Sequence, residues 1–160
     1  MYTQNALLDM HERCHRTFAK LLEHCTTLTE EELHRELDGF GYPTIQAQLH
    51  HVISAEKYWT GVICGRMDAE DTQAQYPTVA SLQAFRSEVA QLTQDCIRGI
   101  AEEALNAARP MKTWGDKDVE LVPALVCLRP LTHAYHHQGQ VLAMCRLLGK
   151  PANGFDFPLT

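Results

Sequence analysis

The sequence lacks any apolar run close to the roughly 20 residues that a membrane-spanning helix needs. Its first residues, MYTQNALLDMHERCH, also lack the basic and then apolar pattern of a secretory signal peptide. Basic residues are few, 14 lysines and arginines against 20 aspartates and glutamates, and no predicted face gathers them as a phosphate-binding surface would. We therefore expect a cytoplasmic protein that binds neither membranes nor nucleic acid.

Cysteine pairs at the C-x-x-C spacing of zinc ribbons and dithiol motifs are also absent. The six cysteines are scattered along the chain as Cys14, Cys25, Cys64, Cys96, Cys127 and Cys145. Several fall on apolar helical stripes, which is typical of reduced thiols in a reducing compartment. No neighbouring pair of lysines or arginines marks one of them as a reactive thiolate. We expect all six to be reduced residues of the core or the surface.

Four segments carry apolar residues at alternating spacings of three and four, the pattern of helices that bury one face in a bundle. They cover residues 3–25, 45–64, 79–100 and 123–148. With 160 residues, of which 45% are apolar, the chain can bury a core of its own. The sequence therefore predicts an all-α, four-helix bundle that forms one domain over residues 1–160.

The segments between these helices carry their own signals. Thr29 and Glu32 form a capping box for a short helical connector. Residues 66–77 are polar and long enough to cross the end of a bundle. Residues 110–122 break the helical period around a Gly-Asp turn, which predicts a small hairpin or an irregular loop. Pro130 removes one backbone hydrogen bond from the last helix, so we expect it to interrupt that helix with a kink.

Two histidines of the last helix, His133 and His137, lie one helical turn apart. Side chains at i and i+4 share a face with Cβ atoms roughly 5–6 Å apart, so both imidazoles can reach one ion. The stripe that runs back from Leu148 through Met144 and Val141 includes both, so they face the core. A buried imidazole needs partners, because an unsatisfied buried polar group costs about 1–3 kcal/mol. A metal ion shared by both rings would be such a partner. The alternative is a separate hydrogen bond to each ring.

His51, in the helix over residues 45–64, is the candidate for a third ligand. It shares a face with Ala55, whereas the adjacent His50 aligns with the polar side, where we expect it to be solvated. Three neutral histidines from two helices leave coordination positions open, as in catalytic rather than structural metal sites. Replacement of His137 by alanine should therefore abolish metal binding, and replacement of His50 should not. Because protons compete with a metal for imidazole, affinity should collapse as the pH falls through about 6.5.

Around these histidines the chain resembles the DinB-like (DinB/YfiT-type) family of metalloproteins. One shared pattern is L-x-H-x-x-x-x-E-x-x-W, formed here by Leu49, His51, Glu56 and Trp59. The other is H-x-x-x-H-R-G-Q, formed here by His133, His137, Gln138, Gly139 and Gln140, with Gln138 in place of the common arginine. The resemblance covers nearly the whole chain, including the closing LLGKP. It implies an up-down-down-up bundle with a long crossover from the second long helix to the third.

The resemblance also implies that His51, His133 and His137 are metal ligands and that the protein is an enzyme. Relatives include thiol-dependent transferases and isomerases. We therefore expect one Zn²⁺ or Ni²⁺ per chain, which activates a thiol or a water for attack on a small electrophilic substrate. Of the two reactions, the resemblance implies addition of a low-molecular-weight thiol as the first candidate and hydrolysis as the second. We also expect a homodimer.

The residue that would act as general base is not identified, and Glu56 and His11 are the candidates. Glu56 is unexpectedly polar for its stripe. It accepts a hydrogen bond from a ligand imidazole, or it makes an ordinary buried hydrogen bond or a subunit contact, and these interpretations stay open. His11 lies on the apolar stripe of the first helix and either lines a pocket above the metal or bonds within the core.

Two other function classes stay open. Glu12 with His15, and Glu31 with His34, match the E-x-x-H spacing of di-iron carboxylate bundles. A non-catalytic, stress-related bundle that binds a metal or a small molecule is the other alternative. Metal content separates the di-iron protein, with two irons per chain, from a bundle with a single zinc or nickel.

Overall fold

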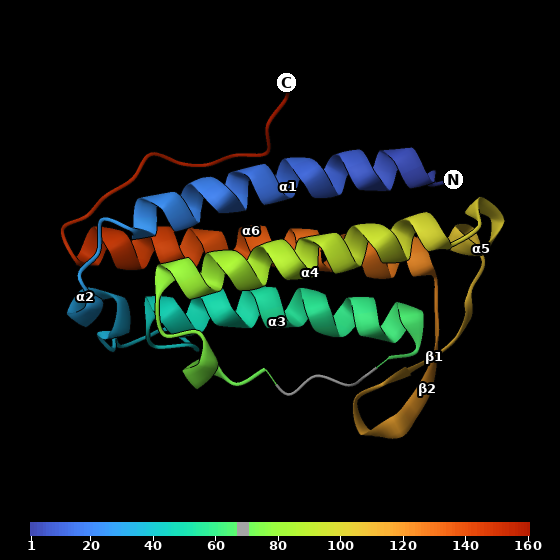
Figure 1. The fold of residues 1–160 in the computed structure, drawn as a ribbon, viewed down its shortest axis with the longest axis horizontal. Helices are drawn as coiled ribbons and strands as arrows, with labels where there is room; N and C mark the ends of the chain where they lie inside the picture. The colour runs from blue at the N-terminus through green and yellow to red at the C-terminus, as the bar shows by residue number, and fades with distance from the viewer. Residues whose placement is uncertain (67–70) are drawn as a thin grey trace.

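The computed structural model describes residues 1–66 and 71–160 (Figure 1). Its helices are α1 (Gln4–Cys25), α2 (Glu30–His34), α3 (Ile45–Cys64), α4 (Val79–Gly99), α5 (Glu102–Asn106) and α6 (Pro123–Leu147), with short 3-10 turns η1 (Gln73–Gln75) and η2 (Trp114–Asp116). Two strands, β1 (Arg109–Thr113) and β2 (Lys117–Leu121), pair as an antiparallel hairpin. The predicted helical bundle and the small hairpin before the last helix are both confirmed, whereas the short helix α5 was not predicted.

Each long helix begins where the sequence supplies a suitable residue. The side chains of Thr3, Thr44 and Thr78 accept hydrogen bonds from backbone N–H groups in the first turns of α1, α3 and α4. Thr29 forms the predicted capping box at the start of α2. α6 begins at Pro123, where the missing N–H group is no loss because the first N–H groups of a helix have no intrahelical partner.

The four long helices form an up-down-down-up bundle. α1 and α6 run in one direction, and α3 and α4 run in the opposite direction (Figure 1). α3 packs against α6 and α4, and α1 closes the bundle by packing against the same two helices. Because α3 and α4 are parallel, the chain between them must run the length of the bundle, from the end of α3 back to the end where α4 begins. The predicted polar connection lies on this return, although residues 67–70 lie outside the described part of the chain.

The apolar core is divided into two clusters along the bundle. One is built from Phe18, Leu21, Leu22, Cys25, Leu33, Ile45, Leu49, Val52, Ile53, Leu82, Phe85, Val89, Val141, Met144 and Cys145. The other is built from Leu7, Val62, Ile63, Ile97, Leu105, Met111, Ala124, Val126 and Cys127. Along every long helix, buried polar residues occupy the positions between these clusters, among them His11, Glu56, Thr93 and His137. The candidate functional residues therefore lie at the middle of the bundle.

α6 continues through Pro130, which we had expected to interrupt it. The proline removes only one backbone hydrogen bond, and its side chain is buried. α6 packs against α3, α1 and α5 on its length. Tertiary packing therefore holds this helix together across the proline, and α6 has the extent that the sequence predicted.

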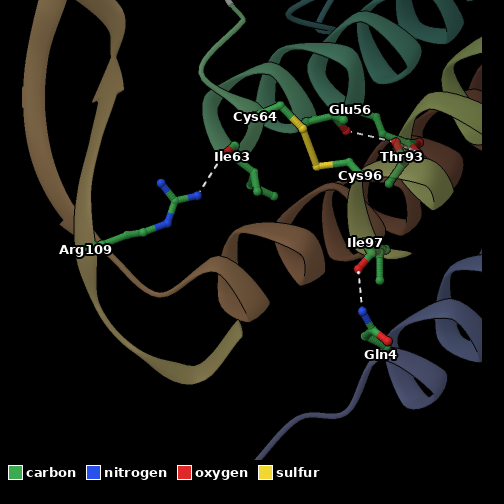
Figure 2. The surroundings of a disulfide bond; sticks show 9 residues. Gln4, Glu56, Ile63, Cys64, Thr93, Cys96, Ile97 and Arg109 are labelled. Carbon is green, nitrogen blue, oxygen red and sulfur yellow. Dashed lines mark hydrogen bonds between the residues drawn. A yellow bond between two sulfur atoms is a disulfide. The ribbon is translucent and has the colours of Figure 1, made fainter. Parts of the chain in front are cut away.

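The hairpin is anchored at the end of α3. Met111 of β1 is buried in the second apolar cluster. The guanidinium of Arg109 donates a hydrogen bond to the carbonyl of Ile63, at 2.7 Å (Figure 2). In the hairpin turn, Trp114 stacks on Tyr58 of α3, with ring centroids 4.4 Å apart. These contacts bring the hairpin turn against the side of α3.

Cys64 and Cys96 form a disulfide that links the ends of α3 and α4 (Figure 2). The expectation that all six cysteines are reduced is therefore wrong for this pair. C-x-x-C spacing identifies neighbours along the sequence, whereas these two residues come from parallel helices and have Cα atoms 6.7 Å apart. The other four cysteines are free and buried, in agreement with the sequence-based expectation of core thiols.

The last residues follow the outside of the bundle as an extended segment. Arg13 of α1 donates a hydrogen bond to the carbonyl of Pro158 at 3.1 Å, and Thr17 donates one to the carbonyl of Asp156 at 3.3 Å. These hydrogen bonds hold the C-terminal segment against α1. Within residues 1–66 and 71–160, no helix combines the length and the apolar character that crossing a membrane requires.

Candidate metal centre

Three histidine rings meet between α3 and α6. Nε2 of His51, from α3, lies 3.2 Å from Nε2 of His133, and Nε2 of His137 lies 3.0 Å from the same atom. His133 and His137 are one turn apart on α6, which runs antiparallel to α3 and packs against it (Figure 1). The structure thus brings together the three residues that the sequence predicted as ligands.

The geometry of this cluster fits one metal ion. Two nitrogen ligands bound 2.0–2.1 Å from a tetrahedral zinc ion lie about 3.3 Å apart, close to the 3.2 and 3.0 Å between these rings. One donor atom from each ring lies within 4.8 Å of the others. His51 and His133 are half-buried and His137 is buried, so the cluster is partly accessible to solvent. The site can therefore hold a metal ion and still admit a small ligand.

The surroundings keep the three imidazoles neutral at neutral pH. Burial, followed by repulsion from His133 and His50, lowers the pKa of His51 to about 4. Burial and repulsion from neighbouring histidines likewise lower the pKa of His137 to about 4. The pKa of His133 is lowered by burial and then by electrostatic repulsion from His136 and Arg129. A neutral imidazole has one nitrogen lone pair available for a metal, which a protonated ring lacks.

A chain of hydrogen bonds fixes which nitrogen of His137 carries the hydrogen. Gln48 of α3 donates from Nε2 to the carbonyl of Tyr42 at 2.9 Å. Because a carbonyl only accepts, this contact fixes the orientation of the amide and makes Oε1 its acceptor. Nδ1 of His137 donates to that oxygen. The lone pair of His137 is therefore on Nε2, the atom that faces the other two rings.

Sequence reasoning missed two residues that contact the cluster. Gln48 is fully buried and lies three residues before His51, on the same side of the helix, so helical spacing could have identified it. The ring of Tyr42 stacks on that of His51, with centroids 4.0 Å apart and an angle of 21°. Tyr42 precedes α3 in an irregular segment, where no periodicity places a side chain.

Glu56 and His11, the two candidates for a catalytic role, lie in a different cluster. The Glu56 carboxylate accepts hydrogen bonds from Nε2 of His11 at 2.8 Å, Nε2 of His15 at 2.9 Å and Oγ1 of Thr93 at 2.8 Å. All four residues are buried. Burial by itself would raise the pKa of Glu56, but the two histidines outweigh it and lower this pKa. Glu56 is therefore an ionised, internally bonded carboxylate rather than a partner of the three-histidine cluster.

His11, His15 and Glu56 also have the donor types of a metal site, and their donor atoms lie within 4.8 Å of one another. The positions of the hydrogens argue against a metal there. Nη1 of Arg86 donates to Nδ1 of His15 at 3.2 Å. Because arginine only donates, Nδ1 of His15 is an acceptor and the hydrogen is on Nε2, where it is donated to Glu56. A nitrogen that carries a hydrogen does not bind a metal, so we interpret this cluster as a buried hydrogen-bond network rather than a metal site.

His50 is buried, and the expectation that it is solvated is wrong. Its ring packs against the rings of Tyr76 and Phe85, with centroids 5.7 and 5.9 Å away, and Nε2 is hydrogen-bonded to Ser54 Oγ at 3.3 Å. α4 and the residues just before it cover this side of α3. Because α3 packs against both α4 and α6, it buries even the side whose sequence is polar.

The two E-x-x-H pairs do not converge. Glu12, Glu31 and His34 are exposed, whereas His15 is buried beside Glu56. Over residues 1–66 and 71–160, the groups able to hold a metal are the three-histidine cluster and the network around Glu56, and neither includes Glu12 or Glu31. The structure therefore contradicts the di-iron interpretation.

Gln138, which replaces the arginine of the family pattern, is buried on α6. Its side-chain amide donates a hydrogen bond to the carbonyl of Phe155. In this chain Gln138 therefore holds the C-terminal segment against the bundle through this hydrogen bond.

Fold and site together define a class of protein, an up-down-down-up helical bundle in which three histidines from two antiparallel helices form a candidate metal centre. The sequence matches the DinB family over residues 1–160, and the chain belongs to that family. Its fold is similar to the crystal structure of a conserved protein from Enterococcus faecalis, with a TM-score of 0.66 and 15% sequence identity over 93% of this chain and 99% of that one. A comparison with curated proteins finds none that matches.

Proposed function

We propose that this chain is a metal-dependent enzyme in which His51, His133 and His137 bind one divalent ion, Zn²⁺ or Ni²⁺. The observation that carries the proposal is the meeting of three Nε2 atoms, with the lone pair of His137 directed toward the others by its bond to Gln48. Three protein ligands leave coordination positions for a substrate, as catalytic metal sites do. Membership of the DinB family supports the same function.

The residues of this chain would hold and orient the ion. When bound, a divalent ion lowers the pKa of a water or thiol so that it can attack an electrophile at neutral pH. Three neutral ligands leave the charge of the ion uncompensated, which strengthens that effect. Gln48 orients the ring of His137, and Tyr42 covers the ring of His51. We propose addition of a low-molecular-weight thiol to a small electrophile as the reaction, with hydrolysis second, because thiol transfer occurs among the relatives that the chain resembles.

Neither Glu56 nor His11 acts as general base in this proposal. The Glu56 carboxylate already accepts three hydrogen bonds, and its lowered pKa makes it a weak base. Nε2 of His11 is used in donating to Glu56. A nucleophile whose pKa is lowered by a metal has less need of a separate base.

Metal content tests the binding step. The protein purified without added metal, or reconstituted with Zn²⁺ or Ni²⁺, is expected to contain one ion per chain. We expect His137→Ala to lose this ion. His34→Gln is the matched control, because His34 is exposed and its Nε2 is hydrogen-bonded to the carbonyl of Pro77, at 2.9 Å. Equal metal content in the two variants would overturn the proposal.

Turnover distinguishes the enzyme from a non-catalytic metal-binding or small-molecule-binding bundle. Glutathione, bacillithiol and mycothiol are each offered with 1-chloro-2,4-dinitrobenzene, and hydrolysis is assayed with 4-nitrophenyl acetate. We expect the loaded protein to accelerate at least one reaction and His137→Ala to lose the acceleration. A fully loaded protein without turnover in these assays would favour the non-catalytic alternative.

Three expectations about partners and location stay predictions: a homodimer, no binding to nucleic acid or membranes, and a cytoplasmic location. Analytical ultracentrifugation tests the first, since a homodimer doubles the 18.1 kDa of this chain.

A further inference from the structure

Arg129 lies one helical turn from the three-histidine cluster, and no acidic partner pairs with it in the described part of the chain. Arg129 precedes His133 by four residues on α6, so the two side chains lie on the same face of that helix. Arg129 is exposed. Its guanidinium carbon lies 4.8 Å from the centre of the Trp59 ring. Over residues 1–66 and 71–160 no carboxylate forms an ion pair with it, although the chain has 20 acidic residues.

Aromatic rings hold this arginine in position. Trp59 belongs to α3, the helix that supplies His51, and the ring of Trp114 from the hairpin turn lies 5.2 Å away at an angle of 81°. Trp114 also stacks on Tyr58, with an angle of 6° between the rings. A guanidinium that stacks on an aromatic face keeps the N–H groups at its edge free for a planar acceptor. The binding edge of Arg129 is therefore preorganised and available.

The charge of Arg129 lies beside the candidate metal centre. Arg129 and His133 are at i and i+4 on α6, so their side chains are neighbours on one face of that helix. A second positive charge beside a cation site disfavours the cation unless an anionic ligand joins the two. A ligand that is anionic at the arginine end would relieve this repulsion. The arrangement therefore selects for negative charge in the molecule that binds across the site.

We propose that Arg129, stacked on Trp59, binds a carboxylate of the substrate while the reacting end of the substrate lies at the three-histidine centre. The inference rests on the proposed function and gives it a substrate class, a small carboxylic acid whose reactive group is separated from the carboxylate by several bonds. A carboxylate matches the fork of a guanidinium with two parallel hydrogen bonds, which a lysine at this position would not supply.

A series of dicarboxylates tests this assignment without requiring turnover. The protein is loaded with Co²⁺, whose visible absorption changes when a ligand reaches the metal, and is titrated with succinate, glutarate, adipate and the monoamide of each. We expect the dicarboxylate of best-fitting length to bind about tenfold more tightly than its monoamide, because only the diacid offers a charged acceptor to Arg129.

Variants identify the residue responsible for that preference. Arg129→Gln is expected to remove the difference between diacid and monoamide, and Arg129→Lys to retain only part of it. Trp59→Leu should weaken the preference while leaving the cobalt content unchanged. Arg146→Gln removes the same charge from an exposed position in the last turn of α6 and is the matched control, which should keep the full preference.

The cobalt content separates failure of this inference from failure of the proposed function. If cobalt binds at the histidines but diacids and monoamides bind alike, or Arg129→Gln keeps the preference, the carboxylate site is wrong and the metal site stands. If no cobalt binds, both are wrong. If Arg129→Gln lowers the thermal stability and weakens every ligand equally, Arg129 is a structural residue that packs on Trp59.

Discussion

His137 and Gln48 are joined by a hydrogen bond across the interface of α6 and α3, from Nδ1 of the ring to Oε1 of the amide. Nε2 of Gln48 donates to Tyr42 and to Oε1 of Gln140, both at 2.9 Å, and Nε2 of Gln140 donates to the ring of His136 at 2.9 Å. In both Gln48 and Gln140 the amide oxygen thus accepts a hydrogen bond and the amide nitrogen donates one. The orientation of the His137 ring is therefore set by residues that lie outside the candidate metal centre.

The first prediction concerns Gln48. Gln48→Ala removes the acceptor for Nδ1 of His137, so the ring is free to turn or to move its hydrogen to Nε2. We expect metal affinity to fall by about 10–100-fold, the usual effect of losing such a partner. Gln48→Glu keeps an acceptor and should retain affinity. Competition with a chromogenic chelator measures these constants.

Gln46→Ala is the control for this experiment. Gln46 is also buried on α3, but its amide donates to the carbonyls of Gln73 and Tyr76, which are not part of the three-histidine cluster. We expect this variant to lose stability and to keep metal affinity. A similar loss of affinity in both variants would mean that general destabilisation of α3, and not the tautomer of His137, is responsible.

The sequence was sufficient for the bundle because local and global signals agree. Thr3, Thr44 and Thr78 mark the starts of three long helices, and the spacing of apolar residues gives each helix one dominant buried face. The same periodicity placed His133 and His137 on one face of α6. Such signals depend only on residues a few positions apart, and they are readable from one sequence.

Contacts between distant segments were not readable in this way. His50 is covered by Tyr76 and Phe85, which reach it from the end of the crossover and from α4. Cys64 and Cys96 meet because two helices run in parallel. Helical periodicity within one segment does not show which other helix packs against it. It therefore could not predict the burial of His50 or the pairing of Cys64 with Cys96.

The second prediction concerns the buried network around Glu56. Glu56→Gln places an amide N–H group among three hydrogen-bond donors, from His11, His15 and Thr93. We expect the free energy of unfolding to fall by about 3–5 kcal/mol, as when a buried charged network loses one member. Metal affinity should stay the same, because Glu56 does not contact the three-histidine cluster. Urea denaturation and chelator competition measure the two quantities.

Glu12→Gln provides the comparison, since Glu12 is exposed on α1 and should change stability little. If Glu56→Gln instead released metal from an otherwise stable protein, Glu56 would belong to a metal site and the hydrogen positions assigned to His15 would be wrong.

The third prediction concerns the disulfide. Cys64 and Cys96 are separated by 32 residues. A cross-link that closes a loop of this size restricts the unfolded chain and stabilises a protein by about 3–4 kcal/mol. We expect the double variant with serine at both positions to lose that amount of stability in urea denaturation. Dithiothreitol should destabilise the natural sequence by a similar amount and leave the double variant unaffected. Equal sensitivity of both proteins to the reductant would show that this bond does not contribute.

The fourth prediction concerns the stability of the metal-free protein in acid. Burial lowers the pKa of His51 and of His137 to about 4, whereas both titrate near about 6.5 in the unfolded chain. Between these values the unfolded chain binds protons that the folded chain excludes, so the stability falls as the pH is lowered through this window. We expect the melting temperature to decline from about pH 6.5 to about pH 4. His34→Gln should follow the same curve, since His34 is exposed.

Metal binding should respond to the same two groups at a lower pH than the sequence alone suggests. Protons compete with a metal for the imidazoles of the folded protein, whose pKa values lie near 4 for His51 and His137. The loaded protein is therefore expected to keep its ion as the pH passes about 6.5, and to release it only as the pH approaches about 4. Equilibrium dialysis at stepped pH measures the retained metal. Release centred near the pKa of a free histidine would show that the folded protein does not shield these rings, and that the cluster is more open than the distances between its nitrogens indicate.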